Sequence, residues 1–79
     1  MFVRTQEGSR FINLDHIIEV FVKGNLLFAK PVKQGEDDIL LGSYEDYERA
    51  QREAHHLMMD KARYDSDSNR KMYYAMPED

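Results

Sequence analysis

The sequence predicts an α+β protein, in which an antiparallel β-meander of four to five strands is covered by one long C-terminal α-helix packed on the sheet. Up to Ser43 the apolar residues occur in short clusters bounded by turn residues, which is typical of strands. Beyond Ser43 they recur at spacings of three and four, which is typical of an amphipathic helix. Since the chain has 79 residues, we expect one small domain with a thin core.

Five short segments are predicted to form the strands. In chain order they are residues 1–5, 11–13, 17–22, 26–30 and 39–42. The third is the strongest prediction, because Ile17 to Val22 is rich in β-branched and aromatic residues. Gly24 and Asn25 follow it as a two-residue turn typical of a hairpin, which pairs the residues on either side of the turn. Leu14 to His16 predicts a bend between the second and third strands.

The apolar residues of these segments form the predicted core. They are Phe2, Phe11, Ile12, Leu14, Ile17, Ile18, Val20, Phe21, Val22, Leu26, Leu27, Phe28, Ile39, Leu40 and Leu41, together with one face of the helix. This is enough for one sheet covered by one helix. It is too little for a closed enzyme pocket, which needs a volume on the order of hundreds of cubic ångströms. We therefore expect any small-molecule site to lie between two subunits.

The helix is predicted to run from Tyr44 to about Tyr64. Ser43 is the expected N-cap, because Asp46 three residues later completes a pattern that resembles a capping box. The residues expected to face the sheet are Tyr47, Ala50, Ala54, Leu57, Met58 and Lys61. Glu53 is expected on the solvent face, in a weak ion pair with the histidine three residues later.

The chain is predicted to divide into an α+β domain, residues 1–64, and a C-terminal tail, residues 65–79. The large apolar residues of this tail are Met72, Tyr73, Tyr74 and Met76. Such a composition is unusual for a free tail. We therefore expect the tail to be ordered by docking on its own domain or by oligomerisation.

Composition and charge argue against several classes of function. The chain has no cysteine, so neither a disulfide nor a thiol nucleophile or metal ligand is available. The formal net charge of −4 argues against a general binder of the phosphate backbone, which usually has a basic face. Since no apolar run reaches about 18 residues, we expect a cytoplasmic protein that does not interact with a membrane.

The sequence contains no motif for catalysis or for binding a metal or cofactor. His55 and His56 are neighbours on the helix and point about 100° apart, so they cannot easily chelate one metal ion. Asp15 and His16 resemble a general base and the group that orients it, but no motif marks a nucleophile for them to activate. We therefore expect no enzymatic activity, no cofactor and no metal.

Methionine and tyrosine residues that the core does not account for predict a protein-binding surface. Met59 lies on the helix away from the apolar face, and Tyr64 flanks that face. Both residue types are enriched at protein interfaces, and methionine adapts to irregular surfaces. The predicted partner-binding residues of this kind are Met59, Tyr64, Met72, Tyr73, Tyr74 and Met76. The alternative is that the tail folds back and these side chains pad a thin core.

A second predicted partner-binding segment is acidic. It consists of Glu36, Asp37 and Asp38, in the polar loop before the last strand. With the acidic stretch from Glu45 to Glu48, these carboxylates could mimic phosphates and occupy a basic groove, so that binding would weaken as salt rises. The simpler interpretation is a polar hairpin loop.

Two segments resemble those of a loose group of small bacterial and phage-borne proteins to which no activity is assigned. They are FINLDHI (Phe11 to Ile17) and LLGSYEDYERAQ (Leu40 to Gln51), and the likeness covers about residues 1–60. This resemblance implies a meander followed by a final helix and assigns no catalytic residue. The segment FINLDHIIEV also resembles strands of LytTR-type DNA-binding domains. The basic residues that would serve such a function are Arg49, Arg52, Arg63, Arg70 and Lys71.

The leading functional hypothesis is a non-enzymatic protein-binding module, whose partner is another protein or a second copy of the chain in a homodimer. In its more specific form, the protein is a phage or mobile-element accessory protein that inhibits a host system, as compact acidic anti-CRISPR proteins do. This form depends on size, acidity and analogy. The alternative is a nucleic-acid-binding regulator with a LytTR-like sheet, which the acidic net charge disfavours.

Overall fold

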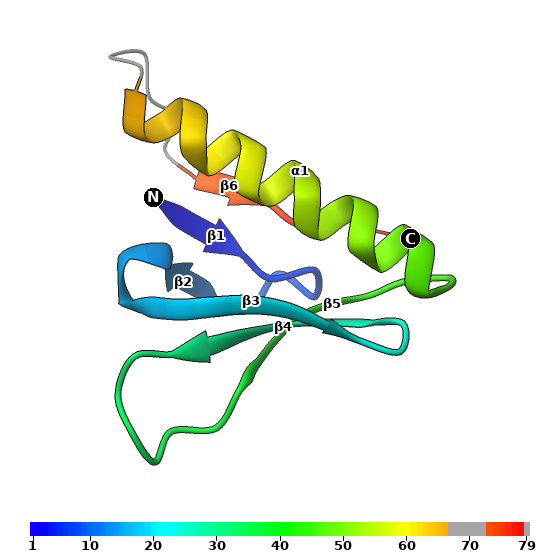
Figure 1. Cartoon of the computed structure of the whole chain (residues 1–79), viewed down its shortest axis with the longest axis horizontal. Coiled ribbons are helices and arrows are strands. Elements are labelled where there is room, and N and C mark those ends of the chain that lie inside the picture. The colour runs from blue at the N-terminus through cyan, green and yellow to red at the C-terminus, as the bar shows by residue number, and fades with distance from the viewer. Residues whose placement is uncertain (67–72, 79) are drawn as a thin grey trace.

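The structure is a computed structural model that describes residues 1–66 and 73–78. This part of the chain contains six strands, a short 3-10 helix and one long α-helix (Figure 1). In chain order they are β1 (Phe2–Arg4), β2 (Phe11–Asn13), η1 (Leu14–His16), β3 (Ile17–Lys23), β4 (Leu26–Pro31), β5 (Ile39–Ser43), α1 (Tyr47–Ser66) and β6 (Tyr73–Ala75). The predicted α+β class is confirmed, and each of the five predicted strands is present.

The strands are divided between two three-stranded sheets. One sheet is the antiparallel meander β3-β4-β5, and the other has the order β2-β1-β6. In the second sheet β1 pairs antiparallel with β2 but parallel with β6, which comes from the predicted tail. The sheets diverge because η1 turns the chain between β2 and β3, where the Asn13 side chain accepts the Asp15 N–H at 3.0 Å.

Backbone and side-chain hydrogen bonds from Gln6 connect the two sheets. Its N–H donates to the Leu41 carbonyl on β5 at 2.8 Å. Its side-chain amide accepts the Ser43 N–H at 2.8 Å and donates to the Ser43 carbonyl at 2.9 Å. Gln6 thus occupies the edge of β5 as a strand would.

The β3–β4 hairpin has the predicted turn and register. Gly24 has a φ of +62°, in the left-handed region that glycine adopts without strain. The residues that flank the turn pair as expected, Val22 with Leu27 and Lys23 with Leu26. The local turn residues therefore determine which side chains face inward along both strands.

The helix begins at Tyr47, three residues later than predicted. Its N-cap is Asp46, whose side chain accepts the Arg49 N–H at 2.8 Å, and the prediction of Ser43 as N-cap is wrong. Tyr44 is instead held by Asn25, which accepts its N–H and donates to its carbonyl, both at 2.9 Å. None of the described helices is long and apolar enough to span a membrane.

Tyr44 belongs to the core. Its side chain is buried, and its ring lies against Gly42, where a Cβ atom would be 2.8 Å from the Tyr44 hydroxyl oxygen. Glycine at position 42 is therefore the residue that lets this ring enter the core.

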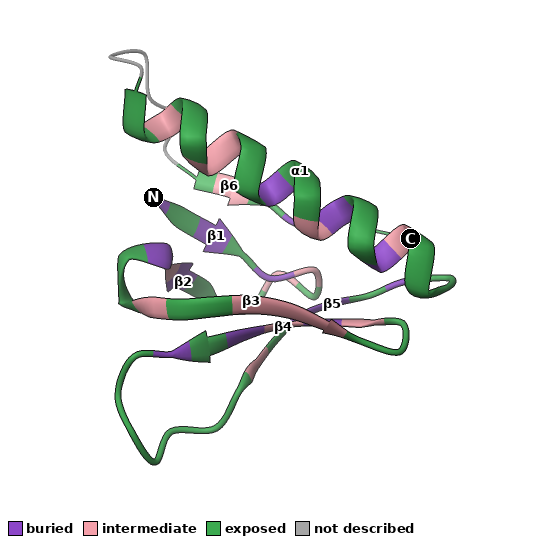
Figure 2. Ribbon diagram, viewed as in Figure 1, coloured by how far each residue is buried: buried purple, intermediate pink, exposed green. Residues whose placement is uncertain are grey.

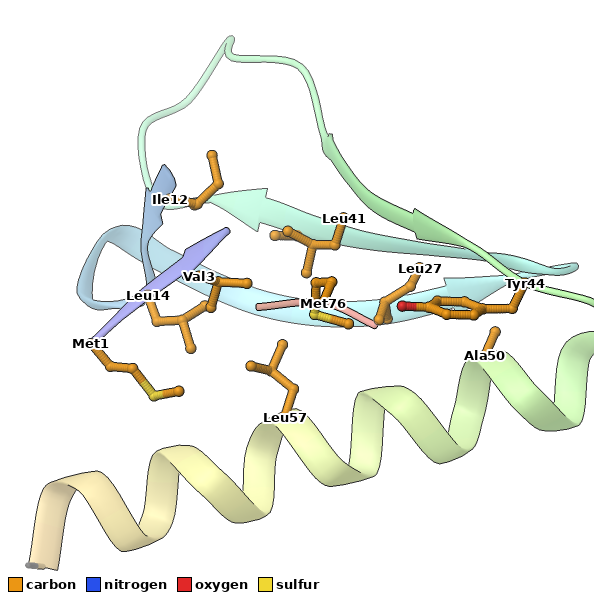
Figure 3. Close-up of a cluster of buried hydrophobic side chains, with 11 residues drawn as sticks. Met1, Val3, Ile12, Leu14, Leu27, Leu41, Tyr44, Ala50, Leu57 and Met76 are labelled. Atoms are coloured by element: carbon orange, nitrogen blue, oxygen red, sulfur yellow. The ribbon is translucent and has the colours of Figure 1, made fainter. Parts of the chain in front are cut away.

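The core lies between α1 and the strands. In Figure 3, Leu57 and Ala50 point from the helix toward the strand side chains. The buried apolar residues are Met1, Val3, Ile12, Leu14, Leu27, Ala29, Leu41, Tyr44, Ala50, Leu57 and Met76. Met76 shows that part of the tail folds back onto its own domain.

The buried face of α1 is rotated from the predicted one. Tyr47 and Met58 are exposed, whereas Glu53 is only 6% exposed, so its predicted place on the solvent face is wrong. The buried helix residues Ala50, Glu53 and Leu57 are spaced three and four apart and form one stripe. The Glu53 carboxylate is compensated by the Arg49 Nε at 2.8 Å and the His56 Nδ1 at 3.4 Å.

Candidate protein-binding surface

Four strand residues of the predicted core are exposed instead. They are Phe2, Phe11, Ile18 and Leu40 (Figure 2). Strand alternation explains why Phe2 and Phe11 are exposed. Val3 on β1 and Ile12 on β2 face the core, so the residues next to them in the sequence face outward. Apolar residues occupy both faces of these strands, and only one face is covered by α1.

Three aromatic rings lie together on the outer face of the sheet β2-β1-β6. Phe2 pairs with Tyr73 across β1 and β6, and Phe11 lies on the same face of β2. Phe2, Phe11 and Tyr73 are 46%, 53% and 40% exposed. The Phe11 and Tyr73 rings meet edge to face with centroids 5.2 Å apart. We call this surface, together with Arg4 on the same side of β1, the aromatic face.

Arg4 is the charged residue within the aromatic face. It pairs with Phe11 on β2 and with Ala75 on β6, so its side chain leaves the sheet on the same side as the rings. The guanidinium lies near Gly8, where a Cβ atom would be 2.6 Å from an Arg4 nitrogen. The β1–β2 turn therefore leaves room for this arginine over the sheet.

A shallow groove lies on the other side of β6, between this strand and α1. Its volume is about 470 Å³, and its lining residues are His55, His56, Met59, Asp60, Arg63 and Tyr74. Burial, together with the negative charges of Glu53 and Asp60, raises the pKa of the Tyr74 hydroxyl. Because its pKa is raised, Tyr74 is neutral at physiological pH. We call this feature the helix groove.

The outer face of the meander also carries apolar side chains, but they cover one another. Phe21 and Phe28 face each other across β3 and β4 and stack with centroids 5.4 Å apart. Both rings are partly buried, while Leu40 beside them on β5 is exposed. This hairpin therefore shields its own aromatic surface more fully than the aromatic face does.

The predicted partner-binding residues fall into separate places. Tyr73 lies on the aromatic face, and Met59 and Tyr74 line the helix groove. Tyr64 packs partly against the core. Met76, at 4% exposure, is within the core and unavailable as a contact residue, as the alternative of a folded-back tail predicts. Met72 lies outside the described residues.

The acidic residues Glu36, Asp37 and Asp38 are exposed in the loop between β4 and β5. This loop extends from the meander on the side away from α1 (Figure 1). The structure therefore does not bring the acidic segment together with the tail residues. Phe2 and Phe11, which complete the aromatic face, are not among the predicted binding residues, because their apolar character alone assigned them to the core.

Within residues 1–66 and 73–78, no group of three or more His, Asp or Glu side chains is placed to hold a metal ion. The basic residues Arg49, Arg52 and Arg63 all lie on α1, with Arg49 paired to Glu53, while Arg70 and Lys71 lie outside the described residues.

No protein-family model, no curated protein and no solved structure matches this chain. The resemblance to small bacterial and phage-borne proteins therefore remains a prediction from the two segments that carry it.

Proposed function

We propose that the chain is a non-enzymatic protein-binding module that binds its partner through the aromatic face. The observation that supports this most directly is the clustering of Phe2, Phe11 and Tyr73, all about half exposed, on one sheet face that also carries an arginine. Aromatic residues and arginine are the types that dominate binding energy at protein interfaces. Scattered exposed apolar residues need no explanation, but a contiguous group on one sheet face is typical of an interaction site.

Burial of the aromatic face would supply a substantial part of the free energy that specific binding needs. Each ring leaves on the order of 90 Å² exposed, and burying that area contributes about 2 kcal/mol. Three rings therefore offer about 6 kcal/mol before the entropic cost of association, which other contacts must help to offset. The rings sit on paired strands, so little conformational freedom is lost when they are covered.

In its more specific form, the proposal is a phage or mobile-element accessory protein that inhibits a host system, as anti-CRISPR proteins do. Its support is the small size of the chain and its net charge of −4, together with analogy. A partner with a basic groove would also engage the exposed carboxylates of Glu36 to Asp38. Binding of that kind would weaken steeply as salt rises, whereas binding through the aromatic face would not.

A capture experiment tests the aromatic face. The tagged wild-type chain, the double variant Phe2→Ala/Phe11→Ala and the control Leu40→Ala are each used for capture from host lysate, and the bound proteins are identified by mass spectrometry. Leu40 is a matched control because it is exposed to a similar degree but lies on the meander. We expect a protein enriched by the wild type and by the control but lost with the double variant. Equal enrichment by all three, or none by any, would contradict the proposal.

A second candidate function is binding of single-stranded nucleic acid at the same face. The observation in its favour is that Arg4 leaves β1 on the same side as the three rings, since bases stack on aromatic and guanidinium planes. A mobility-shift assay with single-stranded DNA and RNA at about 50 mM salt tests it, because backbone contacts are strong there. The absence of a shift would eliminate this candidate.

A further inference from the structure

We propose that a second copy of the chain pairs with the free edge of β6, so that two molecules form one continuous six-stranded sheet. This inference goes beyond the proposed function, because it concerns the backbone edge of β6 and commits to a second copy of the chain as the partner. It depends on the backbone of β6 and on the side chains on either side of this strand.

β6 is an edge strand whose outward backbone groups are available. It pairs only with β1 among the described strands, and the Met76 N–H donates to the Arg4 carbonyl at 3.0 Å. In a parallel pair, alternate residues direct their backbone groups to the neighbouring strand. Tyr74 and Met76 therefore face β1, while the N–H and C=O groups of Tyr73 and Ala75 face away. No hydrogen bond within residues 1–66 and 73–78 uses those four groups.

These outward groups are complementary to themselves under two-fold symmetry. If two β6 strands run antiparallel about an axis at Tyr74, then Tyr73 of each copy lies opposite Ala75 of the other. Each such pair exchanges two N–H···O=C bonds, so all four outward groups of both strands are satisfied. The same patch serves both molecules, as a closed dimer requires.

Both edges of the meander are less open to pairing than β6. The edge of β5 is occupied by Gln6, whose N–H donates to the Leu41 carbonyl. β3 has a register irregularity between Ile17 and Glu19, and bulges and charges on an edge disfavour pairing with another chain. β6 reads Tyr-Tyr-Ala, with neither a charge nor a proline within the strand.

The side chains next to β6 are compatible with a second copy. The helix groove presents the exposed Met59 beside Tyr74, and it carries both a negative charge from Asp60 and a positive charge from Arg63. When two copies of the helix groove approach each other, each therefore presents both a positive and a negative charge to the other, and the two grooves do not repel each other. On the opposite side of the sheet, the two aromatic faces become adjacent, because Tyr73 is the residue of each face that lies nearest the axis. The dimer would thus present a two-fold binding surface.

Replacing Ala75 tests the edge directly. In Ala75→Pro the missing N–H is one that faces away from β1, and proline is tolerated on an edge strand in that position. Ala75→Val keeps the N–H and is the matched control. Sedimentation of the purified proteins over a concentration series should show dimers for the wild type and the control, with at least about tenfold weaker association for Ala75→Pro. A monomeric wild type, or a dimer unaffected by Ala75→Pro, would overturn the proposal.

A cross-linking experiment tests the register. Residues at position 74 of the two copies would face each other as a non-hydrogen-bonded pair about 4.5 Å apart between Cα atoms, within the range for a disulfide. Since the chain has no cysteine, Tyr74→Cys should give a disulfide-linked dimer on mild oxidation. Tyr73→Cys is the control, because position 73 lies opposite position 75 and not opposite itself. Equal cross-linking of both variants, or of neither, would overturn the register.

Both tests use the purified chain alone. A failed capture of a host protein would contradict the proposed function and leave these results unaffected. Circular dichroism of each variant confirms that it is folded, and the Ala75→Pro comparison remains decisive if Tyr74→Cys does not fold.

Discussion

The outer faces of both sheets carry aromatic residues, but the two groups of rings differ in how far they are covered. On the meander, Phe21 and Phe28 come from one hairpin and stack on each other. On the sheet β2-β1-β6, Phe2, Phe11 and Tyr73 come from both ends of the chain and remain about half exposed. The comparison indicates that the hairpin covers its own apolar surface locally, whereas the aromatic face is covered only if another molecule binds there.

The inner faces of the two sheets, in contrast, are covered in the same way. Both sheets contribute to one core under α1, in which Val3 from β1 and Leu27 from β4 are fully buried. The stability of the protein therefore depends on the inner faces, and we assign binding to the outer face of the sheet β2-β1-β6. Substitutions on the two sides should separate these roles.

The largest effect is expected at the helix residue that contacts the shared core. Leu57 is fully buried, so Leu57→Ala should lower the free energy of unfolding by about 3 kcal/mol through lost burial and the cavity left behind. Leu40→Ala, on the outer face of the meander, should lower it by less than about 1 kcal/mol. Urea denaturation of both variants measures the difference, and similar values would contradict the division between inner and outer faces.

A smaller effect should distinguish the two outer faces. Phe28→Ala removes a partly buried ring from a stack and should lower the free energy of unfolding by about 1.5 kcal/mol. Phe11→Ala removes a ring that is 53% exposed, so it should lower the free energy of unfolding by less, even though this ring also contacts Tyr73. Thermal and urea unfolding of the two variants test this order. A greater loss for Phe11→Ala would show that the aromatic face contributes to the fold more than to binding.

The smallest effect should distinguish adjacent residues of β6 on opposite faces. Burial, together with the nearby charges of Glu53 and Asp60, raises the pKa of Tyr74 above the ordinary value of 10.0. Neutral Tyr74 therefore contributes stability that is fully present below pH 10.0 and is lost as the pH rises through its folded pKa. Ultraviolet absorbance during alkaline titration should show one late-ionising tyrosine fewer in Tyr74→Phe than in Tyr73→Phe, which keeps Tyr74. Identical titration curves at high pH for the two variants would contradict the assignment.

One of the three rings of the aromatic face was predictable from the sequence. The excess of tyrosine and methionine in the tail indicated Tyr73, and the position of Met59 on the helix indicated its exposure. Phe2 and Phe11 were not predictable, because Met1, Phe2 and Val3 are all apolar and alternation alone does not say which face is covered. The pairing of β6 with β1 joins residues about seventy positions apart, and no local pattern specifies such a parallel contact.

On the helix, the burial of Glu53 was likewise not predictable from the sequence. Its charge predicts exposure, yet it is buried because Arg49 and His56 supply partners for its carboxylate. Arg49 in turn lies over the Tyr44 ring, 5.5 Å from its centre, and donates to the Glu78 carbonyl at 3.4 Å. These contacts join the helix to both the core and the tail, and they exist only once the chain has folded.

The sequence by itself determined the element types, the hairpin turn at Gly24 and the α+β class, because these follow from local periodicity and turn chemistry. Only the tertiary structure decided that the strands divide into two sheets, that the tail adds β6 and that three aromatic rings meet outside the core. The physical reason is that a period of two distinguishes two faces of a strand but does not identify the covered one. That choice depends on where α1 packs, and α1 packs on one face of each sheet.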